Sequence, residues 1–325
     1  MARLRTPLGW AADRWTLGPR ALRWGTTAAL VTSVLIVLGG VVVRVTGSGL
    51  GCPTWPTCTA DSLISTPELG IHGFIEFANR TVTGLLIVAV GWAIVAARLQ
   101  RPRDRMLTRL AWSMFWLVVA NAIAGGITVW VELNPWVVAL HFVLAMGLLA
   151  CATFTWHRAR WTGGAGARPS AASRSLAWAL VLAAGAVVVT GTLVTGSGPH
   201  AGDSAEVPRM GFDWTTVVVI HASAAVAVLA LAIVLAFRLR IEDGGRLALT
   251  RVGVFLLVLF AQLALGTTQS LIGIPEVLVA IHVVVGSLVW IGALRVLLDT
   301  DPRLWAVRDH QLVAPDADRE PVPSR

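Results

Sequence analysis

Eight long apolar stretches alternate with short polar segments along the chain. Each is rich in Leu, Val, Ile and Ala, and each is long enough, at about 20 residues, to cross the hydrocarbon core of a bilayer as a helix. They cover roughly residues 25–44, 74–97, 110–131, 136–156, 175–195, 215–237, 251–272 and 277–298. The pattern predicts an all-α membrane protein with eight transmembrane helices embedded in a lipid bilayer.

The composition agrees with this interpretation and excludes an ordinary soluble protein. Hydrophobic residues make up 56% of the 325 residues, and 14% are charged. The mean hydropathy is +0.73, whereas a typical soluble domain carries about 25% charged residues. Most of the surface of such a chain needs lipid as its solvent.

The positive charges indicate the orientation of the helices. The formal net charge is +8 and all 26 basic residues are arginines. They are spread over the polar segments rather than gathered in one patch, so we expect no nucleic-acid partner. All except Arg44, Arg80 and Arg209 fall on one side of the membrane if the helices alternate in direction. The positive-inside rule then predicts that both termini are cytoplasmic, and the charged segment before the first helix predicts no cleaved signal peptide.

Two parts of the chain repeat the same order of motifs. The first and fifth predicted helices both end in Val-Thr-Gly-Ser-Gly, at residues 45–49 and 194–198. The third and seventh helices each end near a glycine, followed by a proline and then by His141 or His282. Because each half contains four helices, both halves enter the membrane from the same side. The repeat therefore predicts two tandem four-helix bundles related by a parallel pseudo-twofold axis along the membrane normal.

The repeat divides the chain into five predicted segments. These are a cytoplasmic N-terminal segment (1–23), an N-terminal four-helix half (24–156), a cytoplasmic linker (157–174), a C-terminal four-helix half (175–298) and a cytoplasmic tail (299–325). The linker contains Gly-Gly-Ala-Gly and is expected to be flexible. The tail is rich in Asp, Pro and Arg and is expected to be disordered.

Three of the seven histidines lie inside predicted spans and share one depth. His141, His221 and His282 each stand within about the first two turns of an even-numbered helix, which runs from the outer face inward. An intramembrane ionisable residue is a candidate functional residue, although a single histidine could equally form a hydrogen bond between helices. Facing helices of a four-helix bundle can each supply an axial imidazole to a heme iron. His221 and His282 form such a predicted pair in the second half.

The first half departs from this symmetry. Asn79 stands nearest to the position that corresponds to His221. His72, Glu76 and Asn79 follow the i, i+4, i+7 spacing of one helix face, which we expect to look toward His141. We interpret the second half as built for a fixed cofactor and the first half as built for a substrate that turns over.

Two interpretations of Glu76, a carboxylate well inside a span, stay open. It could form a buried ion pair with Arg80, four residues later. It could instead act as a general acid or base, or as an electrostatic element, beside a bound substrate. In that case Arg80 or Arg44 would contact a carboxylate such as a heme propionate.

Two cysteines stand in the loop after the first helix. Cys52 and Cys58 are separated by five residues on the predicted outer side, where an oxidising compartment allows a disulfide. Such a pair is either a structural staple of the loop or a redox-active dithiol that exchanges electrons or assists substrate transfer. A zinc site is disfavoured because no second Cys/His pair accompanies it. Cys151, in the fourth helix, is interpreted as a small packing residue.

Taken together, these motifs resemble the heme A synthase family, in its bacterial form with eight transmembrane helices. The resemblance covers nearly all of residues 24–298. It is carried by Thr-Gly-Ser-Gly-Leu-Gly-Cys-Pro at 46–53 with Trp55, Pro56 and Cys58, by Glu-Phe-Ala-Asn-Arg at 76–80, by Ala-Leu-His-Phe at 139–142 and by Ala-Ile-His at 280–282. The family comprises bacterial and mitochondrial membrane enzymes that convert heme O to heme A for terminal oxidases.

The resemblance implies a heme-dependent membrane oxidoreductase. It would oxidise the C8 methyl group of the heme O porphyrin to a formyl group through successive hydroxylations and loss of water. The resemblance implies that His221 and His282 ligate a cofactor heme b, and that Glu76 is the catalytic carboxylate. It further implies the bacterial plasma membrane as the location.

The resemblance also assigns the first half to the substrate heme. His141 would bind its iron, and Asn79, Arg80 and His72 would contact it. Heme O synthase or oxidase assembly factors are expected as protein partners.

Two features differ from the pattern of the family. Many members have a histidine where Asn79 stands, so the axial ligation of the substrate iron is open. Some members carry a second cysteine pair in the loop after the fifth helix, but residues 196–214 contain none here. Any thiol chemistry therefore rests on Cys52 and Cys58.

Two other functions compete with this interpretation. A bis-histidine b-type electron carrier without substrate turnover explains His221 and His282 equally well, but it leaves Glu76 and the altered first half without a purpose. A transporter built from parallel repeats predicts ligands near the midplane of the membrane, whereas the histidines here are predicted in the outer leaflet.

Overall fold

The computed structural model describes residues 6–161, 169–242 and 245–304. Every regular element among these residues is helical, apart from one isolated β-bridge between Ser48 and Asp203. The elements are α1 (Pro7–Arg14), α2 (Pro19–Val45), the 3-10 helix η1 (Pro67–Leu69), α3 (Gly70–Arg98), α4 (Arg105–Trp130), α5 (Pro135–Arg158), α6 (Ala171–Ser197), α7 (Trp214–Ile241), α8 (Arg246–Leu271), α9 (Glu276–Thr300) and the 3-10 helix η2 (Pro302–Leu304).

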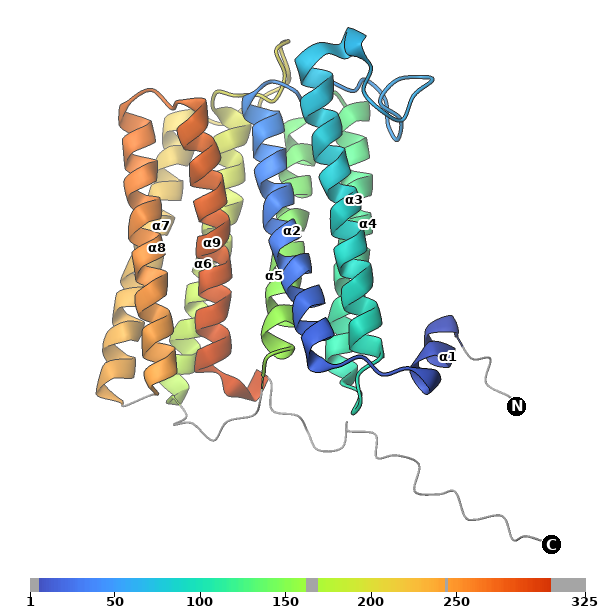
Figure 1. The fold of residues 1–325 in the computed structure, drawn as a ribbon. Coiled ribbons are helices and arrows are strands. Elements are labelled where there is room, and N and C mark those ends of the chain that lie inside the picture. The colour runs from blue at the N-terminus through green and yellow to red at the C-terminus, as the bar shows by residue number, and fades with distance from the viewer. Residues whose placement is uncertain (1–5, 162–168, 243–244, 305–325) are drawn as a thin grey trace, which may run out of the picture.

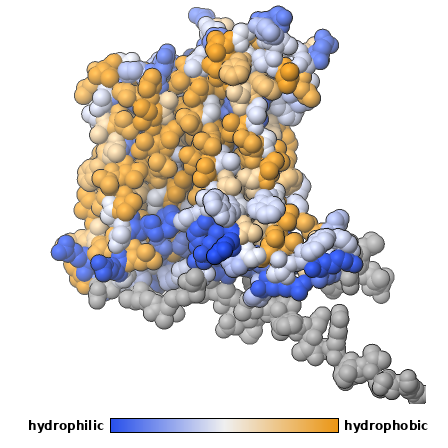
Figure 2. All heavy atoms as spheres, viewed as in Figure 1, coloured by the Kyte–Doolittle hydropathy of each residue, from blue (hydrophilic) through white to orange (hydrophobic). Residues whose placement is uncertain are grey.

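Eight of the described helices, α2 to α9, are long and apolar enough to cross a membrane. This confirms the predicted all-α fold with eight spans. The helices stand side by side in Figure 1, and Figure 2 shows a broad apolar band between two more polar ends. Many large apolar side chains face outward, and Val88, Leu182 and Leu257 are each 71% exposed. Lipid tails provide an apolar surrounding for such side chains, whereas water does not.

The helices extend beyond the apolar stretches because polar residues cap them. At the starts of α4, α6 and α7, the side chains of Asp104, Ser170 and Asp213 each accept a hydrogen bond from a backbone N–H of the first turn. These N–H groups have no partner within the helix, and a side-chain oxygen satisfies them. The apolar pattern marks the lipid-facing part of each helix and stops short of these ends.

Each half closes into a cycle of four helices. In the first half α2 packs against α3, α3 against α4, α4 against α5, and α5 returns to α2; α6, α7, α8 and α9 repeat this cycle in the second half. As a result α3 lies across its bundle from α5, and α7 lies across from α9. The pseudo-twofold axis between the halves stays a prediction of the sequence.

Small residues allow the helices to approach closely. Ala29, Ala93 and Ala97 are completely buried in the core of the first half, as are Ala177 and Ala232 in the second. Lipid tails are as apolar as leucine, so membrane helices associate through close packing rather than through a hydrophobic driving force. Small side chains give the backbones this contact.

The short turns after α4 and α8 have the same local structure. Leu133 and Ile274 both adopt the left-handed region, with φ of 59° and 57°, which is uncommon for branched side chains. The N–H of Leu133 donates to the carbonyl of Thr128, and the N–H of Ile274 donates to that of Gln269. In both turns the acceptor lies five residues earlier, at 2.8 Å. The sequence repeat is therefore also a repeat of local structure at these turns.

The two halves meet along a seam formed mainly by α2, α5 and α9. Val37, Met146 and Leu149 form its buried core. The indole Nε1 of Trp290 on α9 donates a hydrogen bond to the carbonyl of Met146 on α5 at 3.0 Å. The helices that carry His141 and His282 are thus direct neighbours across the seam.

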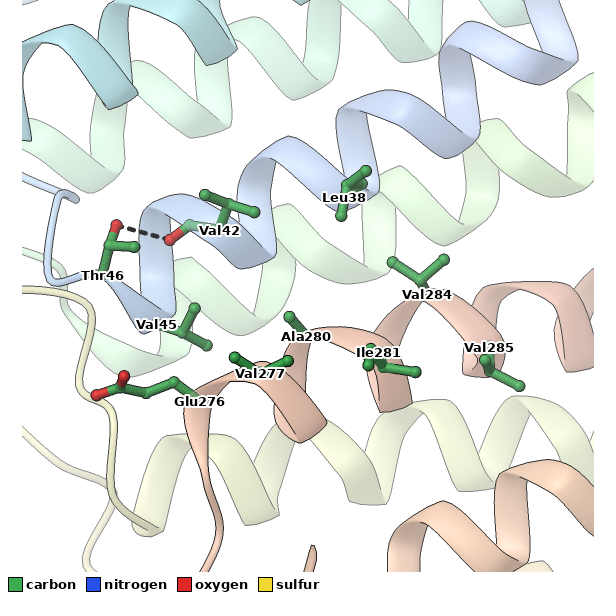
Figure 3. Close-up of a pocket in the computed structure, with 10 residues that line it drawn as sticks. All are labelled: Leu38, Val42, Val45, Thr46, Glu276, Val277, Ala280, Ile281, Val284 and Val285. Carbon is green, nitrogen blue, oxygen red and sulfur yellow. Dashed lines mark hydrogen bonds between the residues drawn. The ribbon is translucent and has the colours of Figure 1, made fainter.

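An apolar groove of about 410 Å³ opens between α2 and α9 at the outer end of the seam. In Figure 3, Leu38 and Val42 on α2 lie opposite Ala280 and Val284 on α9, and Glu276 stands at the end of the groove. The residues that line this groove do not include a predicted site residue. The groove therefore belongs to the seam and is separate from the histidines.

At the opposite, arginine-rich end, Asp299 joins the two halves. Its carboxylate accepts a hydrogen bond from Arg251 Nε at 2.6 Å and lies 4.0 Å from His157 Nδ1 of the first half. The structure thus differs from the prediction of a disordered tail from residue 299, because α9 and η2 continue to Leu304 and Asp299 is held by the ion pair with Arg251. The predictions for residues 162–168 of the linker and 305–325 of the tail lie outside the described residues.

Candidate functional site

Four candidate side chains stand on alternate helices at a similar depth. Asn79 lies on α3, His141 on α5, His221 on α7 and His282 on α9. All four helices begin at the same end of the molecule, and each side chain lies within about the first three turns. Because α3 faces α5 and α7 faces α9, each bundle brings two of these side chains toward one interior.

His221 and His282 form a pair across the second bundle. They lie on α7 and α9, which face each other across this bundle. Nδ1 of His221 is 3.2 Å from Thr190 Oγ1, and Nε2 of His282 is 3.1 Å from Nε2 of Gln262. A hydrogen bond to one ring nitrogen sets the tautomer and leaves the other nitrogen for a metal. The pair therefore has the chemistry of two axial ligands.

A glycine on the preceding helix supports each histidine ring. The pairs are Gly125 with His141, Gly191 with His221 and Gly266 with His282, and a Cβ on the glycine would lie 3.2, 3.2 and 3.0 Å from the ring Cε1. A larger residue would push the ring away, because close-packed interiors have little spare room. This role of the glycines was not predicted from the sequence, although Gly125 and Gly266 hold corresponding positions in the repeat.

We expect Gly266→Ala to disturb heme binding in the second bundle. The added methyl group would press on the His282 ring at 3.0 Å, so the ring must shift from its position opposite His221. Gly253→Ala on the same helix is the matched control, because nothing lies within 4 Å of its added Cβ. The measurement is the heme-to-protein ratio and the absorption spectrum of the purified variants. Equal spectra for the two variants would contradict the supporting role of the glycine.

The first bundle presents two unsatisfied polar groups. Nδ1 of His141 and Oδ1 of Asn79 are buried and have no hydrogen-bond partner among the described residues. Gly39 on α2 makes room for Asn79, since a Cβ there would overlap Oδ1. A buried polar atom without a partner is costly. Both atoms are therefore suited to a ligand that enters this bundle.

Glu76 is held on both carboxylate oxygens. It is 6% exposed. Oε2 accepts a hydrogen bond from the backbone N–H of Cys52 at 2.7 Å, and Oε1 accepts two from the guanidinium of Arg80. The ion pair with Arg80, one of the two interpretations of Glu76, is thus present. The catalytic role of Glu76 stays a prediction.

Arg80 connects Glu76 to the outer loop. Its Nη1 donates hydrogen bonds to the carbonyls of Thr54 at 3.1 Å and Thr57 at 2.9 Å. A charged donor to several carbonyls is stronger than a neutral one, so the ion pair also holds the backbone of the loop. Arg80 is engaged by protein groups here, and its predicted contact with a substrate carboxylate stays a prediction.

The outer loop contains the predicted disulfide and covers the first bundle. Cys52 and Cys58 form a disulfide with an S–S distance of 2.03 Å, and both residues are completely buried. The ring of Trp55 between them packs against Gly126 and makes an edge-to-face contact with Trp130, with the ring centroids 5.5 Å apart. Gly126 follows Gly125, the glycine that supports His141. The loop therefore contacts α4 next to that histidine.

His72 and Arg44 hold the outer loops of the two halves. Nδ1 of His72 is 3.0 Å from Ser48 Oγ, and Ser48 forms the β-bridge with Asp203 of the second half. Arg44 Nη2 donates to the carbonyl of Thr195 at 2.7 Å. In this structure both residues make structural contacts, and their predicted contacts with a substrate stay predictions.

The residues present fit a heme better than a bare metal ion. Among the described residues, no group of three His, Cys, Asp or Glu side chains comes together as a metal site. A heme iron needs only two axial ligands from the protein, and His221 and His282 meet that need. Nδ1 of His282 and Nδ1 of His141 are both buried without a hydrogen-bond partner in the described part of the chain.

Two heme A synthases match part of this chain. The chain is 34% identical over 131 residues to the heme A synthase of Lysinibacillus sphaericus (strain C3-41), a match that covers 39% of this chain and 41% of that protein. It is 32% identical over 136 residues to the heme A synthase of Geobacillus kaustophilus (strain HTA426), which covers 39% of this chain and 40% of that protein. These matches span about two fifths of the length of each relative.

A family model covers far more of the chain than these pairwise matches. The model COX15-CtaA, described as a cytochrome oxidase assembly protein, matches residues 22–294. This range contains α3 to α8 completely, and α2 and α9 except for residues 19–21 and 295–300. It also contains both histidines of the second bundle and the outer loop with its disulfide. The chain therefore belongs to the COX15-CtaA family of cytochrome oxidase assembly proteins.

Proposed function

We propose that this protein is a heme A synthase, which oxidises the C8 methyl group of heme O to a formyl group. The observation that carries this proposal is the difference between the bundles. The second bundle has two histidines facing each other, whereas the first has His141 opposite Asn79 and a buried carboxylate on the same helix as Asn79. A permanent cofactor requires two firm ligands, and a substrate that leaves requires weaker attachment.

In this proposal the second bundle holds heme b through His221 and His282. Thr190 and Gln262 orient the two rings through the contacts at 3.2 and 3.1 Å, as hydrogen bonds to ligand histidines do in other metal sites. When bound, the heme would supply one-electron redox chemistry. The protein residues set the orientation of the ligands.

The first bundle binds the heme O substrate in this proposal. His141 offers the buried ring nitrogen to the iron, and Asn79 offers its buried amide oxygen beside it. An asparagine is a weaker ligand of iron than a histidine, and a weaker ligand suits a heme that must enter and leave.

Glu76 is the proposed acid–base group. Oxidation of a methyl group to a formyl group removes four electrons, which need an electron acceptor outside this chain, and the protons released with them can be accepted by a carboxylate near the reacting carbon. The Cys52 N–H and Arg80 hold the carboxylate in one position, which gives the orientation that proton transfer needs. The same contacts keep the disulfide loop over the outer end of the bundle.

The location and the partners belong to the same proposal. The arginine distribution supports the orientation with both ends of the chain in the cytoplasm, and the family supports the bacterial plasma membrane. A heme O synthase or an oxidase assembly factor would deliver the substrate or receive the product.

The decisive experiment is expression of the chain together with a source of heme O, followed by extraction and chromatography of the bound hemes. We expect both heme b and heme A. The bis-histidine electron carrier predicts heme b alone, so heme b without heme A in the presence of heme O would rule out the synthase. Absence of any Soret band after expression with sufficient heme would rule out both heme functions and favour the transporter.

A further inference from the structure

A second groove lies at the arginine-rich end of the molecule, at the opposite end of the helices from His141, His221 and His282. It has a volume of about 1050 Å³ and is bounded by the start of α1, the end of α3 and the first turns of α4. The guanidinium groups of four arginines line it: Arg98, Arg103, Arg105 and Arg109. Figure 1 shows α1 beside the ends of these helices, and Figure 2 shows polar side chains at this end of the molecule.

The positive charge of this groove is not balanced by the protein residues that the structure describes. None of the four arginines forms an ion pair with a described carboxylate, and the nearby Asp104 is bound to Arg158 at 2.6 Å. Nε of Arg103 is buried and has no hydrogen-bond partner among the described residues. Burial and the neighbouring Arg98 and Arg105 lower the pKa of Arg103. Four like charges around one groove are stabilised when an anion enters it.

The walls of the groove are held in place by hydrogen bonds to backbone carbonyls. The segment after α1 is bound to the loop after α3, because the N–H of Leu17 donates to the carbonyl of Leu99 at 3.0 Å and Gln100 Nε2 donates to the carbonyl of Leu17 at 2.8 Å. Arg101 Nη2 reaches the carbonyl of Ala12 at 2.8 Å. The groove is thus a built feature of the fold, formed before any ligand arrives.

Tryptophans place the groove at the depth of the lipid headgroups. Trp112 and Trp116 line it and are 38% and 63% exposed. Trp10 on α1 and Trp15 just after it are also exposed, at 44% and 54%. Tryptophan is enriched at the boundary between the hydrocarbon core and the headgroups, and a short helix with aromatic and basic residues suits the plane of the membrane surface.

We propose that this groove binds the phosphate headgroup of an anionic phospholipid from the adjacent leaflet. Guanidinium groups bind phosphate oxygens in pairs, and basic pockets between transmembrane helices bind anionic headgroups. Thr6 and Ser113 add hydroxyl groups to the lining, and the tryptophans contact the glycerol and the start of the acyl chains. This site is independent of the proposed heme chemistry.

The test is native mass spectrometry of the purified full chain in detergent, titrated with dioleoylphosphatidylglycerol or with dioleoylphosphatidylcholine. We expect the wild type to retain the anionic lipid in preference to the zwitterionic one. The double variant Arg103→Gln/Arg109→Gln should bind phosphatidylglycerol roughly 10- to 30-fold more weakly, since each arginine at a membrane surface contributes on the order of 1 kcal/mol. Arg240→Gln/Arg246→Gln is the matched control, because it removes two exposed arginines from the same end of the second half.

Two measurements on the wild type keep the proposal testable if the double variant does not fold. Raising the salt concentration should weaken phosphatidylglycerol binding, because the attraction is electrostatic. Inorganic phosphate at millimolar concentration should not displace the lipid. Equal affinity for the two lipids, equal loss in the control variant, or full displacement by phosphate would overturn the proposal, the last in favour of a site for soluble anions.

Discussion

Replacing Glu76 with glutamine is expected to lower heme A formation at least about 100-fold, while the amount of bound heme b stays at the wild-type level. General acid–base groups contribute on the order of 100- to 10,000-fold to a rate. Glutamine keeps the size of the side chain and an oxygen that can accept the Cys52 N–H, whose bond to Glu76 is 2.7 Å long. The glutamine side chain cannot take up a proton as the carboxylate of Glu76 can. The measurement is heme A per heme b after extraction from cells supplied with heme O.

Two further variants separate catalysis by Glu76 from its structural role. Glu68→Gln makes the same chemical change at an exposed position in η1 and should leave heme A formation unchanged. Arg80→Gln breaks the ion pair and the bonds to the loop carbonyls while keeping the carboxylate. Leaving a buried charge without its partner costs about 3–5 kcal/mol. The charge left behind in Arg80→Gln is that of Glu76, which is less exposed than Arg80, and this variant also loses the bonds to the loop carbonyls, so it should lower thermal stability more than Glu76→Gln does.

Heme A formation and thermal stability should therefore rank Glu76→Gln and Arg80→Gln in opposite orders. Glu76→Gln should be the more damaging change for heme A formation, and Arg80→Gln the more damaging change for stability. If Glu76→Gln instead kept the wild-type level of heme A formation, the ion pair with Arg80 would be the role of this carboxylate, and its proposed role in proton transfer would be wrong.

Replacing either His221 or His282 with alanine is expected to reduce bound heme b on the order of 10-fold or more. Each substitution removes one of the two protein ligands proposed for the iron. Each lost ring is one that a neighbouring side chain holds in place, at 3.2 Å for His221 and 3.1 Å for His282. Heme A formation should fall with the loss of heme b. The pyridine hemochrome assay of the purified variants gives the heme-to-protein ratio directly.

His141→Ala is the matched comparison, since it removes an equivalent ring from the other bundle. We expect this variant to keep heme b in the second bundle and to lose heme A formation. The control for folding is the melting temperature of each purified variant. Loss of heme b in His141→Ala to the same extent as in His221→Ala would show that the assignment of the two bundles to cofactor and substrate is wrong.

The fold was largely predictable because lipid imposes a simple rule on the sequence. A span needs about 20 apolar residues, and each of the eight apolar stretches forms one helix from α2 to α9. The short helix α1 was not predicted, because eight residues are too few to form a stable helix without support from the rest of the protein. Residues 299–304 were expected to be disordered from their composition, yet α9 and η2 continue to Leu304 and Asp299 is held by the ion pair with Arg251.

The candidate site was predictable only in part. The histidines and Glu76 stand out because ionisable residues are rare inside membranes. Their partners could not be found in the same way. The glycines that support the rings and the backbone N–H of Cys52 on Glu76 are ordinary groups, and their importance comes from contacts between helices and loops that the local sequence does not encode.

The sequence by itself determined the number of helices, the division into two halves, the shared depth of His141, His221 and His282, and the pairing of Cys52 with Cys58 as a candidate disulfide. These follow from hydrophobicity and spacing along one chain, which are local properties. Only the tertiary structure decided that α5 and α9 are neighbours, that both oxygens of Glu76 are bound by the loop and Arg80, and that four arginines gather around one groove. The physical reason is that helix packing depends on the fit of side chains from distant parts of the chain, whereas insertion into lipid depends on each stretch alone.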